Sequence, residues 1–188
     1  MSNAVSALKG AFAQGFVRVS EKGPHGMITV RGKLSDAKIK AGVKAALAVA
    51  VPGQRKINAK NDVSVAWMSP DELLVLCPYD QADALVQTLQ SKLSDQHALV
   101  AKVSDARALI EVSGVDVREV LAKLTPADVS ETAFTVGDFR RSRLAQVAAA
   151  FWLQDEATLQ IVCFRSVAQY VFDILKISGE TGSEVEYF

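Results

Sequence analysis

The chain has 188 residues, 49% hydrophobic and 22% charged, which is the balance of a folded globular protein that can bury a core. Its 21 basic and 21 acidic residues give a formal net charge of zero, which argues against nucleic acid or a membrane surface as the main partner, because both select for a basic surplus. No signal peptide is evident and the longest apolar stretch, residues 144–153, is too short to span a bilayer, so a cytoplasmic location is expected.

The first half of the chain is predicted to form one β-α-β-β-α unit. Residues 1–20 have a weak pattern and are expected to form an N-terminal arm with room for one short helix. Apolar alternation predicts strands and helical spacing predicts helices. The expected elements, in chain order, are a strand at 27–31, a helix at 36–49 and a polar basic connector at 54–62. The two strands of a hairpin follow at 63–67 and 73–77, and a second helix at 81–93.

The second half is predicted to repeat this order after an additional strand at 97–103. Residues 125–138 read as a loop because of the break at Thr125 and Pro126. Residues 179–188 read as a polar, acidic tail that ends in Tyr187 and Phe188. The other expected elements are a strand at 108–112, a helix at 115–124, the two strands of a hairpin at 143–152 and 158–164, and a closing helix at 167–177.

The two halves also share sequence, which indicates an internal duplication. Residues 28–32 return at 110–114, an offset of 82, and residues 67–77 return at 152–163, an offset of 85 to 86. Two copies are too few for a solenoid and fit a pseudo-symmetric domain. We therefore predict an α+β fold of two β-α-β-β-α units, with antiparallel sheets covered on one face by helices. The expected limits are an arm at 1–20, one domain at 21–178 with repeats at about 26–94 and 97–178, and a tail at 179–188.

Few residues suggest metal or thiol chemistry. Cys77 and Cys163 end apolar strands at equivalent points of the two repeats, which is typical of small buried side chains in a reducing compartment. A disulfide between them would require the two strand ends to lie within bonding distance. His25 and His97 have no other ligand residues at metal-binding spacing, so no metal site is predicted.

Three stretches carry a resemblance to known proteins. They are residues 104–129 (SDARALIEVSGVDVREVLAKLTPADV), 67–76 (WMSPDELLVL) and 139–147 (FRRSRLAQV). The first resembles the strand, glycine and helix signature of folate-dependent aminomethyltransferases, the T-protein of glycine cleavage. Together, the three stretches are most similar to the gamma subunit family of heterotetrameric sarcosine oxidase. The resemblance covers about residues 26–177 and implies an aminomethyltransferase folate-binding-like domain.

The resemblance implies a subunit rather than a complete enzyme. T-proteins work with a carboxylate in the segment that corresponds to residues 144–150 (LAQVAAA), and this segment holds no carboxylate. Gln146 can form hydrogen bonds but is no general acid or base near neutral pH. No catalytic residue is therefore predicted. The chain also lacks a glycine-rich dinucleotide-binding motif and a P-loop.

The implied complex oxidatively demethylates sarcosine to glycine and yields hydrogen peroxide, while the methyl carbon passes to tetrahydrofolate as 5,10-methylenetetrahydrofolate. Its alpha, beta and delta subunits would be the partners of this chain. FAD, FMN, NAD and tetrahydrofolate would be held by the complex, with no cofactor bound by this chain.

Arg140, Arg141 and Arg143 are the main candidate site residues. Arginine offers a bidentate geometry to carboxylates, so these side chains could bind acidic groups of a partner subunit or the glutamate tail of a folate. The alternative is a solvated strand edge with local ion pairs worth under about 1 kcal/mol each. Tyr187 and Phe188 are further candidates for partner contact, since exposed aromatic side chains gain from burial.

Trp67 and Trp152 stand at what read as matched places in the two repeats, which favours core packing over a pterin-stacking platform. Two other functions stay open. A stand-alone folate-binding protein would use Arg141 or Arg143 with Trp152, and an active aminomethyltransferase would need an unrecognised carboxylate such as Asp138.

Overall fold

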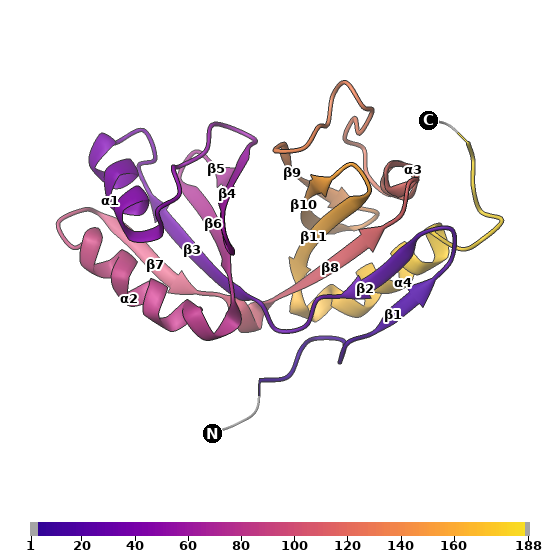
Figure 1. Ribbon diagram of the computed structural model, residues 1–188, viewed down its shortest axis with the longest axis horizontal. Coiled ribbons are helices and arrows are strands. Elements are labelled where there is room, and N and C mark those ends of the chain that lie inside the picture. Colours follow the sequence, from indigo (N-terminus) through magenta and orange to yellow (C-terminus); the bar gives the residue numbers. More distant parts are fainter. Residues whose placement is uncertain (1–3, 187–188) are drawn as a thin grey trace. The chain divides into compact units, whose positions relative to one another are not determined.

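The structure, a computed structural model, describes residues 4–186 of the chain (Figure 1). Its contacts divide these residues into two compact units. The 25–104 unit is continuous in sequence. The 105–186 unit also includes residues 4–24, which precede the other unit in the chain.

The 25–104 unit is a five-stranded antiparallel sheet with two helices against it. The strand order is β4-β5-β6-β3-β7. Asp36 caps the first helix by accepting a hydrogen bond from the Lys38 N–H, and Ala48 ends that helix in the left-handed conformation, at φ +56°. The elements are β3 (Gly26–Gly32), α1 (Ala37–Leu47), β4 (Ile57–Lys60), β5 (Val63–Ser69), β6 (Glu72–Cys77), α2 (Ala82–Lys92) and β7 (Ala98–Lys102).

The core of this unit follows from strand alternation. Every second side chain of a strand faces the helices, and every third or fourth side chain of a helix faces the sheet. The packed side chains include Ile28 and Val30 of β3, Leu73 and Val75 of β6, Ile39 and Val43 of α1, and Leu89 of α2. Full burial of each such side chain stabilises the fold by about 1.5–3 kcal/mol.

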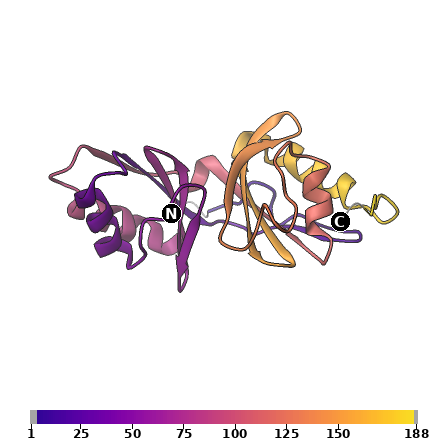
Figure 2. The same cartoon turned by 90° about the horizontal axis from the view of Figure 1, so that it is seen from above.

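The 105–186 unit has a six-stranded antiparallel sheet of order β1-β2-β8-β11-β10-β9. Strands β9 to β11, the orange ribbons, lie side by side in both views (Figures 1 and 2). The elements are β1 (Phe12–Gln14), β2 (Arg18–Glu21), β8 (Arg107–Ser113), α3 (Val117–Ala122), β9 (Phe139–Leu144), β10 (Val147–Asp155), β11 (Thr158–Phe164) and α4 (Ala168–Ser178).

The backbone confirms the duplicated α+β fold. The central strands share one order, β4-β5-β6-β3 in one unit and β9-β10-β11-β8 in the other. Ile28 pairs with Val75, and the residues at offsets of 82 and 86, Ile110 and Ile161, also pair. The predicted helices and hairpin β5–β6 are present. Within the duplicated strand order, each unit has one strand that was not predicted as such, β4 in one and β9 in the other.

Both additional strands lie at sheet edges. Residues 54–62, expected to be a connector, contain β4, whose apolar alternation is limited to Ile57 and Ala59 within a basic, polar segment. The single strand expected at 143–152 is wrong. Strand β9 ends at Leu144, and a two-residue turn, with Ala145 at φ +48°, leads into β10. No glycine, proline or asparagine marks that turn, so the pattern gave no signal for it.

The matched positions assigned to the two tryptophans are also wrong. In the paired hairpins, Trp67 lies opposite Leu73, and the equivalent pair is Leu153 with Leu159. Trp152 is therefore one residue out of register, and a one-residue shift moves a side chain to the other face of a sheet. Trp67 packs against the helix-facing core of its unit, whereas Leu153 holds that place in the other unit.

The segment expected as an N-terminal arm forms β1 and β2 rather than a helix, and β2 pairs with β8. Glu21 organises the residues before β1, because its buried carboxylate accepts hydrogen bonds from Ser6 Oγ and from the backbone N–H groups of Leu8 and Gly10. Strand β7, expected at the start of the second repeat, pairs with β3 in the 25–104 unit.

The tail is attached to α3 through its backbone. The Glu119 carboxylate accepts hydrogen bonds from the N–H groups of Val185 and Glu186, and these bonds, led by that from Val185, lower its pKa. The Lys123 ammonium donates to the carbonyl oxygens of Ser178, at 3.0 Å, and Ser183, at 2.6 Å. The candidate residues Tyr187 and Phe188 lie outside the described residues.

Candidate functional site

The three candidate arginines lie on β9 and are divided between its two faces. Arg141 and Arg143 are exposed and share one face, because they are two residues apart. Arg140 points to the other face and is partly buried. The structure therefore separates a triplet that the sequence presents as one group.

Arg140 is bound within the fold. One of its nitrogens donates to the Ala133 carbonyl at 2.6 Å, and another lies 3.6 Å from the Asp138 carboxylate. Its guanidinium also lies 5.5 Å from the ring centre of Phe134. These contacts hold the loop before β9, so the Arg140 guanidinium is bound within the fold, whereas Arg141 and Arg143 are exposed.

Arg118, which sequence reasoning did not single out, holds the same loop from the other side. This α3 side chain is 8% exposed and donates to the carbonyls of Val129, at 2.9 Å, and Phe134, at 2.7 Å. A second nitrogen lies 3.2 Å from the Glu156 carboxylate. The only signal in the sequence was an arginine within an otherwise apolar helix face.

Asp138, the carboxylate considered for an aminomethyltransferase, is part of this loop. It accepts hydrogen bonds from the backbone N–H and the hydroxyl of Thr135 at 2.9 and 3.0 Å, and it pairs with Arg140. The residue is 7% exposed. A carboxylate with these partners is suited to bracing the loop.

Trp152 is a packed side chain. It is 8% exposed and stacks on Phe139, its cross-strand neighbour, with 5.7 Å between ring centres and 29° between ring planes. In this packing, its face is covered by Phe139 rather than open to a pterin. Arg141, Arg143 and Trp152 share one face of the sheet, because residues 141 and 143 pair with 150 and 148, and a role for these three side chains in folate binding stays a prediction.

A polar cluster on β8, β10 and β11, with Lys22 beside it, was missed by sequence reasoning. The buried Gln160 amide donates to the Glu111 carboxylate at 2.7 Å and to the Gln154 side chain at 3.0 Å, and Lys22 lies 3.1 Å from Glu111. Among the described residues, the Gln160 amide oxygen has no hydrogen-bond partner. No sequence pattern marks this cluster, because its members come from distant segments.

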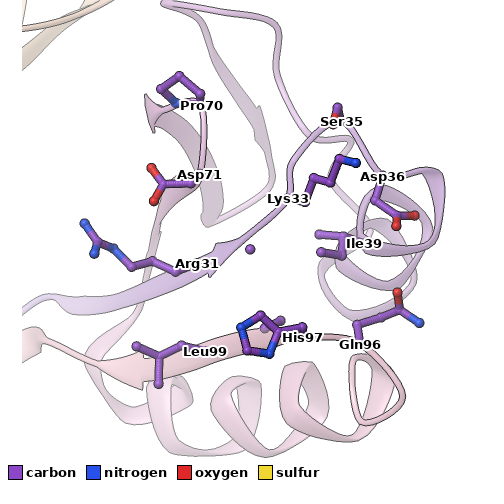
Figure 3. Close-up of a pocket in the computed structure, with 12 residues that line it drawn as sticks. Arg31, Lys33, Ser35, Asp36, Ile39, Pro70, Asp71, Gln96, His97 and Leu99 are labelled. Carbon is purple, nitrogen blue, oxygen red and sulfur yellow. The ribbon is translucent and has the colours of Figure 1, made fainter.

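A cavity of about 920 Å³ lies in the 25–104 unit, between the end of β3, the start of α1, the β5–β6 turn and the start of β7 (Figure 3). Ile39, Ala98 and Leu99 give it apolar walls. Its charged side chains are those of Arg31, Lys33, Asp36 and Asp71, and His97 adds an imidazole to the lining.

The charges around this cavity are balanced, and most are already engaged. Arg31 donates to Glu72 at 3.0 Å, Asp36 caps α1, and Asp71 accepts a hydrogen bond from the Ser69 hydroxyl. Figure 3 shows Arg31 and His97 on separate sides of the β3 end.

The cysteines match their predicted role as buried, unpaired side chains. Cys77 and Cys163 are free thiols at equivalent ends of β6 and β11. Burial raises the pKa of Cys77 to about 11 and that of Cys163 to about 12, so both stay protonated near neutral pH. Within residues 4–186, no three His, Cys, Asp or Glu side chains group as a metal site would require, and no helix has the length and apolarity to cross a membrane.

The fold is similar to that of several solved structures. A chain of heterotetrameric sarcosine oxidase from Corynebacterium sp. U-96, solved in complex with pyrrole 2-carboxylate, superposes with a TM-score of 0.81 at 23% identity, over 89% of this chain and 86% of that one. The aminomethyltransferase T of the glycine cleavage system from Bartonella henselae has a TM-score of 0.59 at 14% identity, over 86% of this chain and 46% of that one. Both matches concern the fold.

Sequence comparison gives relatives of one kind. Sarcosine oxidase subunit gamma from Arthrobacter sp. is 29% identical over 124 residues, which are 65% of this chain and 60% of the relative. The same subunit from Corynebacterium sp. strain U-96 is 29% identical over 140 residues, 73% of this chain and 65% of the relative. The chain thus spans less than two thirds of the length of these relatives.

The family model described as "Sarcosine oxidase, gamma subunit family" matches residues 31–180, which include most of both sheets and all four α-helices. This match covers more than half of the chain, so the protein belongs to the sarcosine oxidase gamma subunit family.

Proposed function

We propose that this chain is the non-catalytic gamma subunit of a cytoplasmic heterotetrameric sarcosine oxidase. The observation that carries the proposal is the family match over residues 31–180. In the proposed complex, sarcosine is oxidatively demethylated to glycine, with formation of hydrogen peroxide and 5,10-methylenetetrahydrofolate. The alpha, beta and delta subunits are the partners, and the complex holds FAD, FMN, NAD and tetrahydrofolate.

The side chains of the described residues support a scaffolding role. Asp138, the carboxylate named as an example for an aminomethyltransferase, is engaged by Thr135 and Arg140. Both thiols are buried and protonated near neutral pH. Trp152 stacks on Phe139. Asp138 and Trp152 are thus engaged by neighbouring side chains, and the two thiols are buried in the core.

The test is co-expression of this chain with the alpha, beta and delta subunits of its source organism, followed by size-exclusion chromatography. The proposal expects one complex that contains all four chains. It also expects sarcosine-dependent peroxide formation, or flavin retention, to be lost when this chain is omitted. A chain that elutes alone would overturn the proposal.

Assays of the isolated chain decide between a scaffold and the two other functions. A stand-alone folate-binding protein would bind tetrahydrofolate as the isolated chain. An aminomethyltransferase would transfer the methylene group by itself, and Asp138→Asn would abolish that activity. A scaffold shows neither activity as the isolated chain.

A further inference from the structure

The outer edge of β9 is open. Strand β9 is the last strand of its sheet and pairs only with β10. Within the described part of the chain, the backbone of residues 139–144 makes no hydrogen bond to any other segment. An open strand edge offers a row of backbone donors and acceptors to another strand.

The register shows which backbone groups point to that edge. Residues 144 and 147 close the two-residue turn, so Leu144 and Val147 form a hydrogen-bonded pair. Pairs alternate along an antiparallel ladder between hydrogen-bonded and non-hydrogen-bonded. Arg141 and Arg143, opposite Ala150 and Ala148, therefore form non-hydrogen-bonded pairs, and their N–H and C=O groups face outward.

The same two residues carry the exposed positive charges of the strand. Their side chains share one face and lie opposite alanines, which are too small to cover them. Within residues 4–186, neither guanidinium makes an ion pair or a hydrogen bond. Arg140, which would extend the charged row, is turned to the other face and bound to Ala133 and Asp138.

We propose that β9 binds an extended, acidic segment of a partner subunit by strand addition. The backbone of Arg141 and Arg143 continues the hydrogen-bond ladder, and the two guanidinium groups pair with carboxylates at alternate positions of the added strand. Residues two apart on a strand are separated by about 7 Å, so acidic residues at every second position match the arginine pair. The partner is one of the subunits of the proposed complex, so this inference rests on the proposed function.

Charge supports an acidic protein partner. The chain as a whole is neutral, with 21 basic and 21 acidic residues, so two unpaired arginines on an open edge form a local basic site rather than part of a basic surface. Bidentate pairs between arginine and carboxylate add orientation as well as affinity. A neutral chain with a local basic edge is suited to one defined acidic strand.

The first experiment uses the four-subunit complex with Arg141→Glu and Arg143→Glu combined. The matched control combines Lys40→Glu and Lys92→Glu, which changes the net charge by the same amount at two exposed helix positions. We expect the charge-reversed β9 chain to bind the other subunits about 100-fold more weakly and the control to bind within about threefold of wild type. Equal affinity of the β9 variant and wild type would overturn the inference.

Hydrogen exchange resolved to single residues tests strand addition itself. In the isolated chain, the amides of Arg141 and Arg143 should exchange rapidly, whereas the amides of Ser142 and Leu144 should be protected by β10. In the complex, the amides of Arg141 and Arg143 should exchange at least about tenfold more slowly. Unchanged exchange of these two amides on complex formation would overturn strand addition.

The outcomes separate this inference from the proposed function. If wild type fails to co-elute with the other subunits, the proposed function is wrong. If wild type co-elutes and the β9 variant does so equally well, only the inference about β9 is wrong. If the isolated chain self-associates and the β9 variant abolishes this, the added strand belongs to a second copy, and the assignment to a partner subunit is wrong.

Discussion

Replacement of Arg118 by methionine should unfold the loop before β9 and lower the stability of the protein. Arg118 lies on α3 and is 8% exposed. Its guanidinium donates to the carbonyl oxygens of Val129 at 2.9 Å and Phe134 at 2.7 Å. Methionine keeps most of the apolar stem but removes every donor, so these buried carbonyls lose their partner.

The magnitude follows from the contacts. A hydrogen bond from a charged donor contributes about 1.5–3 kcal/mol, so two such bonds contribute about 3–6 kcal/mol. Part of this is recovered, because the variant no longer buries a guanidinium and water reaches some carbonyls of the opened loop. The ion pair with Glu156 adds about 0.5 kcal/mol or less, since that carboxylate is 74% exposed. We expect a net loss of about 3 kcal/mol in the free energy of unfolding.

Urea denaturation followed by circular dichroism measures the effect, and two variants serve as controls. Glu156→Gln removes only the exposed ion pair and should change the free energy of unfolding by about 0.5 kcal/mol or less. Arg141→Met makes the same chemical change at an exposed arginine of β9 and should be equally mild. A loss below about 1 kcal/mol for Arg118→Met would refute the reasoning that this side chain organises the loop.

Three further changes test other parts of the fold. Gly42→Ala in α1 should lower the melting temperature in spite of the better helix propensity of alanine, because the new Cβ would lie 2.6 Å from a Leu93 methyl carbon and 2.9 Å from the Lys92 carbonyl oxygen. Gly53→Ala, where the new Cβ would meet open space, should leave the melting temperature unchanged. Cys77 and Cys163, whose pKa values burial raises to about 11 and about 12, should resist a thiol reagent up to about pH 9 and react only on unfolding. The tail should detach in acid. Hydrogen bonds from its backbone lower the pKa of Glu119, so the attachment is complete above the ordinary carboxyl pKa of about 4.3 and is lost as the pH falls through the lower folded pKa. Glu119→Gln should likewise speed exchange of the tail amides at neutral pH, and equal exchange in both proteins would contradict this role.

The buried elements were the predictable part of the fold. Strands such as β6 and helices such as α1 show their period in the sequence, because burial on one face selects apolar residues at regular spacing. The edge strands β4 and β9 were missed or merged with their neighbours, because β4 alternates over only four residues and β9 carries three arginines in place of apolar side chains. The turn at Ala145 was invisible for a related reason, since alanine is no turn signal.

The place of the three candidate arginines beside the last hairpin was predictable from the sequence, but their division between the two faces of β9 was not. The sequence presented Arg140, Arg141 and Arg143 as one group. Strand alternation divides them only once the limits of β9 are known, because the strand limits decide which residues face the loop and which face outward. The contacts of Arg118 and Gln160 could not be predicted, since both depend on segments that are distant in sequence. The single domain over residues 21–178 stays a prediction.

The duplication also indicates where the two units differ in function. Equivalent positions hold the same or similar core residues. Ile28 matches Ile110 on the central strands, and Cys77 matches Cys163 at the strand ends, so the two units have similar cores. The difference lies in the segment that leads to the edge strand. In one unit, residues 48–56 connect α1 to β4, whereas the longer segment 123–138 connects α3 to β9 and is held by Arg118 and Arg140. A loop fixed by two arginines lies directly before the strand that presents Arg141 and Arg143. Val129 and Phe134 of this loop also pack into the core of their unit, so the loop completes that core and leads directly into β9, where the proposed partner strand would bind.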